Sequence, residues 1–364
     1  MRILMFNSNL SKNSGVMNVI MNYYRIINNN IQFDFLYFRD SENSYEKEIE
    51  QLGGECFKIS SPKNIYIFKK ELNHFCLEHE NYNVVHIHDA IFAKLMYKTL
   101  KKNGVKNVIV HSHATKYSDK RISELRNYLI CKNIVKYADQ LFACSELAGK
   151  FLFKDKEFYI MKNAINPAKY QFSEEIREKM RKELKINNQL VIGHVGAFVN
   201  QKNHTFILNV FKEYLSKNSN SLLLLVGDGP LFDKIKQKSI DMGIYDNVIF
   251  LGKRNDVSSL YQVMDIFLLP SLYEGLPMVG VEAQCSGLSV IFSSEITKEV
   301  KIGKTSFINL SDPIEKWINQ IVLLKNEINM FDRNSGTNDL RRCGFDILNE
   351  SVKLIEKYKE IVRN

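Results

Sequence analysis

Residues 270–287 read PSLYEGLPMVGVEAQCSG, directly after the apolar run at residues 265–269. A short apolar run of this kind is typical of a buried parallel strand. The run stops at Pro270, and Pro277 stands where the first residue of a helix is expected. The segment therefore predicts a strand, a short loop and a helix, which is the unit from which parallel α/β sheets are built.

Two carboxylates bracket the predicted loop, Glu274 within it and Glu282 on the helix, eight positions apart. The start of a helix offers free N–H groups and the positive end of the helix dipole, which suit a phosphate. An ionised carboxylate accepts hydrogen bonds without donating any, which suits the hydroxyls of a sugar. The arrangement predicts a binding site for a sugar nucleotide. The alternative is a strand–helix unit with one exposed loop acid and one solvated helix acid.

The same stretch resembles the Glu-x7-Glu signature of the retaining glycosyltransferases of family 4, which have the GT-B fold. Besides the two acids, prolines and glycines fall at matching places, namely Pro270, Gly275, Pro277 and Gly287. The resemblance covers most of the chain and is strongest over residues 192–300. In the first half, residues 142–146 and the Val-x-x-His-x-His element at 108–113 are similar to the branch that builds capsular polysaccharides and exopolysaccharides.

Strand-like runs alternate with helical stretches along the whole chain, which favours parallel sheets with helices on both faces. The predicted strands are residues 2–6, 33–37, 84–87, 108–111 and 140–144, and after Pro167 residues 191–195, 221–226, 248–251, 265–269 and 289–292. The predicted helices include residues 16–28, 91–103 and 125–137. Two such series predict two Rossmann-like β/α/β domains that face a central cleft, with ligands at the carboxyl ends of the strands.

The boundary between the two series falls near residues 163–167. This segment resembles the Asn-Gly-Ile-Asp that follows the last amino-terminal strand in the family, with Ala164 and Asn166 as departures. We expect an acceptor-side domain at residues 1–166 and a nucleotide-sugar-binding domain at residues 167–345. The resemblance implies that the last segment, residues 346–364, forms a helix that packs back across the first domain.

The composition is that of a soluble globular protein, with 45% hydrophobic and 25% charged residues in 364. The six cysteines are scattered without a Cys-x-x-Cys pair, so neither a zinc site nor a disulfide framework is predicted. The amino-terminal apolar run is too short for a signal peptide. No window approaches the ~20 apolar residues that a spanning helix needs. A cytoplasmic location with reduced thiols is expected.

The net charge of +9 is concentrated in one segment. Residues 94–136 contain eleven Lys or Arg and two acids, an excess that equals the net charge of the whole chain. Near residues 116–126 the basic residues mix with apolar ones, a combination that suits an anionic lipid surface on the inner face of the plasma membrane. The alternative is a solvated basic helix face. Nucleic acid is not expected, because no recognition motif accompanies the charge.

The second domain opens with a strand that runs into a glycine-containing turn, residues 193–204. Gly196 lets the backbone approach a phosphate, and Lys202 supplies a compensating positive charge. The element resembles the family's Gly-Arg-(x)n-Lys-Asn, whose Arg and Lys hold the donor diphosphate, but Ala197 stands at the Arg position. The loss of that bidentate clamp leaves Lys202 and the helix start to neutralise the departing diphosphate.

The other donor-binding positions that the resemblance implies are Gly15, Gly227, Arg254, Gly275, Leu276 and Pro277. Gly15 lies in a loop that meets a diphosphate or the acceptor, although Ser14 replaces the first glycine of the family motif. Gly227 ends a strand at the cleft, and Arg254 borders the nucleobase. Plain turn geometry is the alternative for both.

Two pairs of histidines end predicted strands, His86 with His88 and His111 with His113. His113 matches the family histidine that lies against the transferred sugar, and His111 is its competitor for that role. A hydrogen-bonded structural imidazole is the alternative for both. Metal binding by His86 and His88 is disfavoured, because no third ligand accompanies them.

The resemblance implies a retaining, metal-independent hexosyltransferase. It would move a hexose or N-acetylhexosamine from a nucleoside diphosphate sugar, with a UDP-sugar expected, to a lipid-diphosphate-linked glycan in capsule or exopolysaccharide synthesis. Glu274 would hold the sugar hydroxyls, Glu282 the ribose diol, and Lys202 the departing diphosphate. No Asp-x-Asp occurs, so neither a catalytic metal nor another cofactor is expected. Front-face attack fits better than double displacement, because no acid is an evident nucleophile.

Two other functions remain open. A sugar-nucleotide epimerase shares the GT-B fold but needs an acid/base cluster beside the anomeric carbon, and none is evident. A non-catalytic partner that binds sugar nucleotide or glycan for a second transferase is suggested by Ala197 and Ser14. Donor turnover separates the three, since the glycan is elongated, the sugar is epimerised, or neither occurs.

Overall fold

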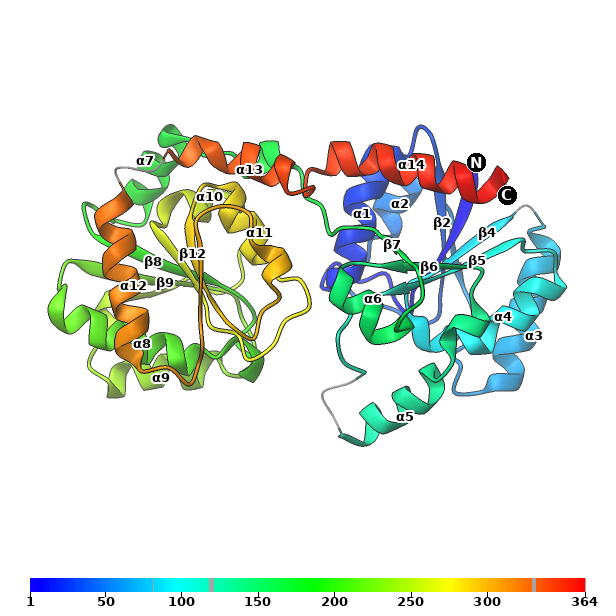
Figure 1. The fold of residues 1–364 in the computed structure, drawn as a ribbon, viewed down its shortest axis with the longest axis horizontal. Coiled ribbons are helices and arrows are strands. Elements are labelled where there is room, and N and C mark those ends of the chain that lie inside the picture. Colours follow the sequence, from blue (N-terminus) through cyan, green and yellow to red (C-terminus); the bar gives the residue numbers. More distant parts are fainter. Residues whose placement is uncertain (81, 118–120, 329–331, 364) are drawn as a thin grey trace. The chain divides into compact units, whose positions relative to one another are not determined.

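The computed structural model describes residues 1–80, 82–117, 121–328 and 332–363. The chain divides into a first unit of Met1–Ile165 with Asp346–Asn364, and a second unit of Asn166–Phe345. Each unit is a parallel sheet with helices packed on it (Figure 1). The predicted α/β class with two Rossmann-like domains is confirmed.

The sheet of the first unit has the strand order β3-β2-β1-β4-β5-β6-β7, and all its pairs are parallel. The strands are β1 (Arg2–Phe6), β2 (Gln32–Tyr37), β3 (Cys56–Lys58), β4 (Val84–Ile87), β5 (Asn107–Ser112), β6 (Gln140–Ala143) and β7 (Tyr159–Ile160). The chain first adds strands on one side of β1 and then crosses to β4 on the other. The pair β1 and β4 therefore flanks the topological switch point, where open α/β sheets bind ligands.

Helices packed on this sheet bury two apolar cores. The helices of this unit are α1 (Gly15–Ile27), α2 (Glu46–Gln51), α3 (Ile65–Glu78), α4 (Ala93–Lys102), α5 (Arg121–Cys131), α6 (Glu146–Phe153) and α14 (Ile347–Arg363). One core includes residues of α1 and α14, and the other includes residues of α3 and α4. The C-terminal helix α14 packs against α1 and buries Leu354, Tyr358 and Ile361.

The second unit repeats this plan, with the strand order β10-β9-β8-β11-β12-β13. Its strands are β8 (Leu190–Val195), β9 (Ser221–Val226), β10 (Val248–Phe250), β11 (Ile266–Leu269), β12 (Ser289–Ser293) and β13 (Thr305–Ile308). Its helices are α7 (Glu174–Glu183), α8 (His204–Lys217), α9 (Phe232–Asp241), α10 (Val257–Val263), α11 (Met278–Cys285), α12 (Ile314–Glu327) and α13 (Gly336–Arg342). Here β8 and β11 flank the switch point.

Some predicted elements differ from the observed ones. Residues 125–137, expected as one helix, form the end of α5 and a separate 3-10 turn, because Asn133 adopts a left-handed conformation with φ 60°. Pro277 caps α11 instead of opening it, so this helix begins at Met278. The edge strands β3, β7 and β13 were not predicted, because none of them forms a continuous buried apolar run.

Candidate functional site

Lys202 and Glu274 meet at the switch point of the second unit. Lys202 ends a 3-10 turn shortly after β8, and Glu274 lies in the loop after β11. Lys202 Nζ donates to Glu274 Oε1 at 2.5 Å, and the two side chains are only 15% and 10% exposed. Adjacent parallel strands end at the same edge of a sheet, so the topology brings these residues together although 72 positions separate them.

Gln201 fixes the loop that carries Glu274. Its Nε2 donates to the carbonyl of Tyr273 at 2.9 Å and to Glu274 Oε2 at 3.2 Å, and its own carbonyl accepts from Leu272 N at 2.8 Å. Both oxygens of Glu274 therefore have a donor. The sequence reasoning missed Gln201, although its place beside Lys202 in the motif was a usable signal.

Glu282 is held by two tyrosines. Tyr170 OH donates to its Oε1 and Tyr261 OH to its Oε2, each at 2.9 Å. Burial raises the pKa of Glu282, and the two tyrosine hydrogen bonds act in the opposite direction. Burial raises the pKa of both tyrosines as well, so both are protonated donors near neutral pH. No sequence spacing indicated them, since they lie 112 and 21 positions from Glu282.

Glycines line the same edge of this sheet. Gly196 N donates to Val226 O at 2.9 Å, and Gly227 N donates to Gly252 O at 2.8 Å. Gly227 has φ +135°, and a Cβ there would lie 2.0 Å from the carbonyl oxygen of Gly196, so only glycine fits. A Cβ on Gly196 would lie 3.2 Å from Cδ of Lys202. Because Gly196 and Gly227 have no side chains, they add no bulk to the sheet edge beside Lys202.

The other predicted donor contacts lie on neighbouring loops. Gly275 and Leu276 are half-buried between Glu274 and the start of α11, and Pro277 is buried. Arg254 follows β10, but its guanidinium donates to both oxygens of Asp256, at 2.8 and 2.6 Å. Arg254 is therefore engaged within its own loop.

Gly15 begins α1 at the switch point of the first unit. Ser14 caps this helix by accepting from Met17 N at 3.3 Å, so the serine that replaces the family's glycine has a structural use. A Cβ on Gly15 would meet nothing within 4 Å. Neither sterics nor φ demands a glycine there.

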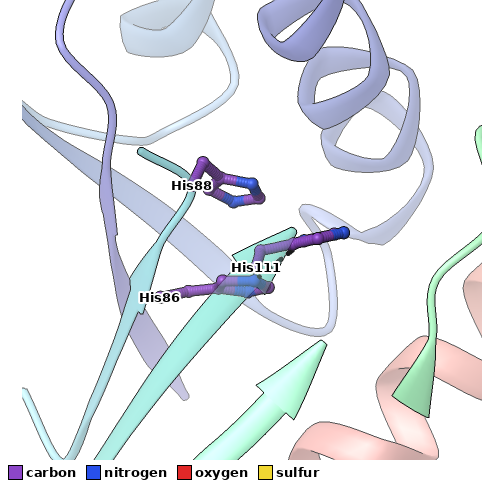
Figure 2. A group of neighbouring side chains, drawn as sticks. All are labelled: His86, His88 and His111. Carbon is purple, nitrogen blue, oxygen red and sulfur yellow. Dashed lines mark hydrogen bonds between the residues drawn. The ribbon is translucent and has the colours of Figure 1, made fainter. Parts of the chain in front are cut away.

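Four histidines stack at the ends of β4 and β5 (Figure 2 shows three of them). His88 Nδ1 and His113 Nε2 are 2.9 Å apart, and His86 Nε2 and His111 Nδ1 are 3.1 Å apart. His86 Nδ1 also bonds Tyr358 OH of α14, at 2.7 Å. Burial lowers the pKa of all four histidines, that of His113 to about 3, so the stack is neutral.

Of the two competing histidines, His113 is the more accessible. His111 is fully buried, whereas His113 is half-buried. Both line a pocket of about 260 Å³ in the first unit, together with His88, Val16 and residues of α5 and α6. Access favours His113 for contact with a ligand and leaves His111 as a packed neighbour, whose ring centroid is 3.9 Å away.

The expectation that His86 and His88 lack a third possible ligand was wrong. His111 brings a ring nitrogen within 4.8 Å of theirs, because β4 and β5 pair in register. The rings of His86 and His88 are, however, stacked at 15° with centroids 4.2 Å apart, and the nearest nitrogens of His86 and His111 already bond each other. Imidazole lone pairs lie in the ring plane, so stacked rings do not direct them at one ion. This arrangement is a hydrogen-bonded stack.

The basic segment at residues 94–136 contains α5. Ile122 is 88% exposed, and Leu125, Tyr128 and Leu129 are exposed beside Arg126. Lys120, which belongs to the same basic segment, lies outside the described residues. Among the helices that the structure describes, none is long and apolar enough to cross a membrane.

Comparisons with known proteins agree on one family. The family model of the glycosyl transferases group 1 matches residues 175–304. The putative glycosyltransferase EpsF of Bacillus subtilis is 31% identical over 333 residues, which cover 88% of this chain and 86% of EpsF. A UDP-Gal:alpha-D-GlcNAc-diphosphoundecaprenol alpha-1,3-galactosyltransferase of Escherichia coli is 27% identical over 79% of this chain and 78% of its own length.

Solved structures share the fold at low sequence identity. The structure of Anabaena Alr3699/HepE in complex with UDP and glucose superposes with a TM-score of 0.80 at 15% identity, and covers 99% of this chain and all of that one. WaaG, a glycosyltransferase involved in lipopolysaccharide biosynthesis, superposes with a TM-score of 0.65 at 15% identity, over 97% of this chain and 98% of its own.

Proposed function

The chain belongs to the group 1 glycosyltransferases of polysaccharide biosynthesis, which have the GT-B fold, and within that family we propose that it is a retaining, metal-independent hexosyltransferase. It takes a hexose or N-acetylhexosamine from a UDP-sugar. It passes this sugar to a lipid-diphosphate-linked glycan in capsule or exopolysaccharide synthesis.

The observation that carries the proposal is the Lys202–Glu274 pair at the switch point of the second unit. Gly196 and Gly227 lie beside it and add no side chains to that edge of the sheet. A lysine ammonium and a helix start suit a diphosphate. A carboxylate suits sugar hydroxyls. When the donor binds, Lys202 turns to the diphosphate and Glu274 accepts from the hydroxyls, with the N–H groups of Gly275 and Leu276 beside it.

Glu282 completes the donor site in this proposal. Its two oxygens each retain lone pairs beyond the tyrosine bonds, so a ribose diol can donate to the same carboxylate. Arg254 meets the nucleobase only if its pair with Asp256 opens. We therefore assign the nucleotide chiefly to Glu282 and the diphosphate to Lys202.

The reaction is a front-face substitution. A bond forms between the acceptor hydroxyl oxygen and the anomeric carbon on the face from which the diphosphate departs. The bond from that carbon to the diphosphate oxygen breaks, and the departing phosphate takes the hydroxyl proton. Lys202 stabilises the negative charge that develops on the diphosphate. His113 orients the transferred sugar.

Relatives and structural neighbours support the choice of substrates. HepE was solved with UDP and with UDP-glucose, and the E. coli relative is named for a UDP-galactose donor and a diphosphoundecaprenol acceptor. A lipid-linked acceptor lies at a membrane, and the exposed apolar residues of α5 with Arg126 suit an anionic lipid surface. We propose a cytoplasmic protein that is peripheral on the inner face of the plasma membrane.

The test begins with a thermal-shift panel of nucleotides and nucleotide sugars, because binding to the folded state raises stability. UDP and one UDP-sugar are expected to raise Tm, and that UDP-sugar should release UDP when lipid-linked glycan is added, with or without EDTA. A panel without any shift overturns the donor assignment. Binding without turnover of any donor favours the non-catalytic partner suggested by Ala197, and a need for Mn²⁺ or Mg²⁺ overturns metal independence.

A further inference from the structure

The hydrogen bond between His88 and His113 limits which of their ring nitrogens can carry a proton. His88 is 4% exposed, its Nδ1 lies 2.9 Å from His113 Nε2, and its Nε2 is buried without a hydrogen-bond partner among the described residues. Both rings are neutral near pH 7, because burial lowers the pKa of each. Each ring therefore carries a single N–H, and one of the two donates in the shared bond.

The two ways to place these protons differ in what they leave unpaired. If His113 donates through Nε2, the proton of His88 must sit on its buried Nε2, where it has no acceptor. If His88 donates through Nδ1, its buried Nε2 is only an unused lone pair. Buried N–H groups without a partner are rarer than under-used acceptors, so the second arrangement is favoured.

The stack holds this pair in place. The ring of His111 lies over that of His113 with centroids 3.9 Å apart, and the ring of His86 lies over that of His88 at 4.2 Å. Tyr358 on α14 bonds His86 at the far end. Because packed side chains seldom leave their rotamers, His113 is not free to turn its ring over and exchange its two nitrogens.

We propose that His88 is a positioning residue that holds His113 as its Nδ1–H tautomer, so that His113 meets the substrates as a neutral hydrogen-bond donor through Nδ1. This inference rests on the proposed function, which brings His113 to the transferred sugar. A donor at that place fits a sugar oxygen. It also leaves His113 unable to accept the proton of the acceptor hydroxyl, which in the proposed reaction passes to the departing phosphate.

The first experiment reads the tautomer directly in the full-length protein, by long-range ¹H–¹⁵N correlation of the histidine side chains near pH 7. The spectrum is assigned with His113→Gln. The expected pattern is a protonated Nδ1 and a bare Nε2 in His113. A protonated Nε2 overturns the proposal, whether or not the protein transfers sugar.

Variants of His88 test the consequence. His88→Leu removes the donor, and we expect kcat to fall by about tenfold or more while UDP affinity in the second unit stays unchanged. His88→Gln keeps an amide N–H for His113 and should recover part of kcat. If His88→Leu does not fold, the His88→Gln protein and the wild-type spectrum still decide, because a Gln variant with lost kcat and a protonated Nε2 in His113 overturns the idea.

Phe142→Leu is the matched control, because Phe142 packs in the same core against His86 and His111 without touching the His88–His113 bond. It should leave the tautomer and kcat unchanged. If Phe142→Leu and His88→Leu lose kcat equally, with the His113 tautomer intact in both, His88 acts only through packing. Wild-type protein that binds no UDP-sugar would instead remove the proposed function and leave the tautomer result standing.

Discussion

Both units carry their candidate site residues at the carboxyl ends of neighbouring parallel strands, but they hold them by different means. In the second unit, loops after β8 and β11 bring Lys202 and Glu274 into an ion pair. In the first unit, the ends of β4 and β5 bring together His88 and His113, two neutral imidazoles that bond each other. The same topology thus presents charge in one unit and uncharged hydrogen-bonding groups in the other.

The difference matches the chemistry proposed for each side. A diphosphate leaves with negative charge, which a buried cation stabilises strongly because little water screens it. An acceptor hydroxyl and a sugar are uncharged. A buried charge beside them would lose its hydration and gain no opposite charge in compensation. The comparison predicts that variants of the second unit act through charge and those of the first through hydrogen bonds and packing.

Loss of the lysine should have the largest effect. Lys202→Ala removes the cation that we propose for the departing diphosphate, and we expect kcat to fall by about a hundredfold to a thousandfold, the usual effect of deleting one preorganised electrostatic group. Steady-state kinetics with the preferred UDP-sugar measure it. Lys316→Ala is the control, since it deletes a lysine from an exposed pair with Asp312 in the same unit and should change kcat little. Equal kinetics for the two variants would contradict the role of Lys202.

Glu282 should come next. Glu282→Ala removes the charged acceptor that we propose for the ribose and should weaken UDP binding by about tenfold to a hundredfold, since such a bond contributes ~1.5–3 kcal/mol. Replacing both Tyr170 and Tyr261 with Phe deletes the two bonds that oppose burial, so the pKa of Glu282 should rise further. UDP affinity, measured by calorimetry from pH 5 to pH 8, should then be lost at a higher pH than in the wild type. Coincident pH profiles would refute the tyrosine effect.

Acid should act on the first unit more steeply than on the second. The four stacked histidines have pKa values below the ordinary 6.5, that of His113 at about 3, so below about pH 6.5 the unfolded chain binds protons that the folded stack does not bind. Stability is therefore full above about pH 6.5 and falls on acidification, by about 1.4 kcal/mol per histidine per pH unit.

The second unit should respond less. It has two such histidines, His194 and His204, against four in the first unit. Each unit also has a buried acid whose raised pKa works in the opposite direction, Asp89 in the first and Glu282 in the second. Hydrogen exchange at pH 7 and pH 5.5, corrected for intrinsic rates and read for each unit, measures the difference. Equal losses of protection in the two sheets would contradict it.

The sequence predicted groups that share one local unit better than groups that meet through packing. Glu274 and Glu282 lie on one strand–loop–helix segment, so their spacing was visible. Tyr170 and Tyr261 reach Glu282 only through tertiary packing, and nothing in their local sequence marks them. The alternating histidines were visible, but their stack depends on the register of β4 against β5.

The basic segment of the first unit tests whether charge there serves a membrane instead of the reaction. Reversing Lys116, Lys120, Arg121 and Arg126 to Glu should abolish sedimentation with anionic liposomes, because each basic residue near such a surface contributes ~1 kcal/mol. UDP binding by the second unit should be unchanged. The wild type should also detach as salt is raised. If the variant still sediments, or the wild type never does, the segment is only a solvated face.

The smallest effect is expected where the second unit departs from the family pattern. Ala197 lies exposed on the turn between β8 and Lys202. An arginine there would reach a diphosphate from a solvated position, and exposed charge pairs contribute only ~0.2–1 kcal/mol. Ala197→Arg should therefore tighten UDP binding by no more than about fivefold, with Ala197→Gln as the uncharged control of similar length. A gain in the Arg variant alone would mean that the family's clamp is missing here, and equal affinities would mean that Lys202 and the start of α11 already neutralise the diphosphate.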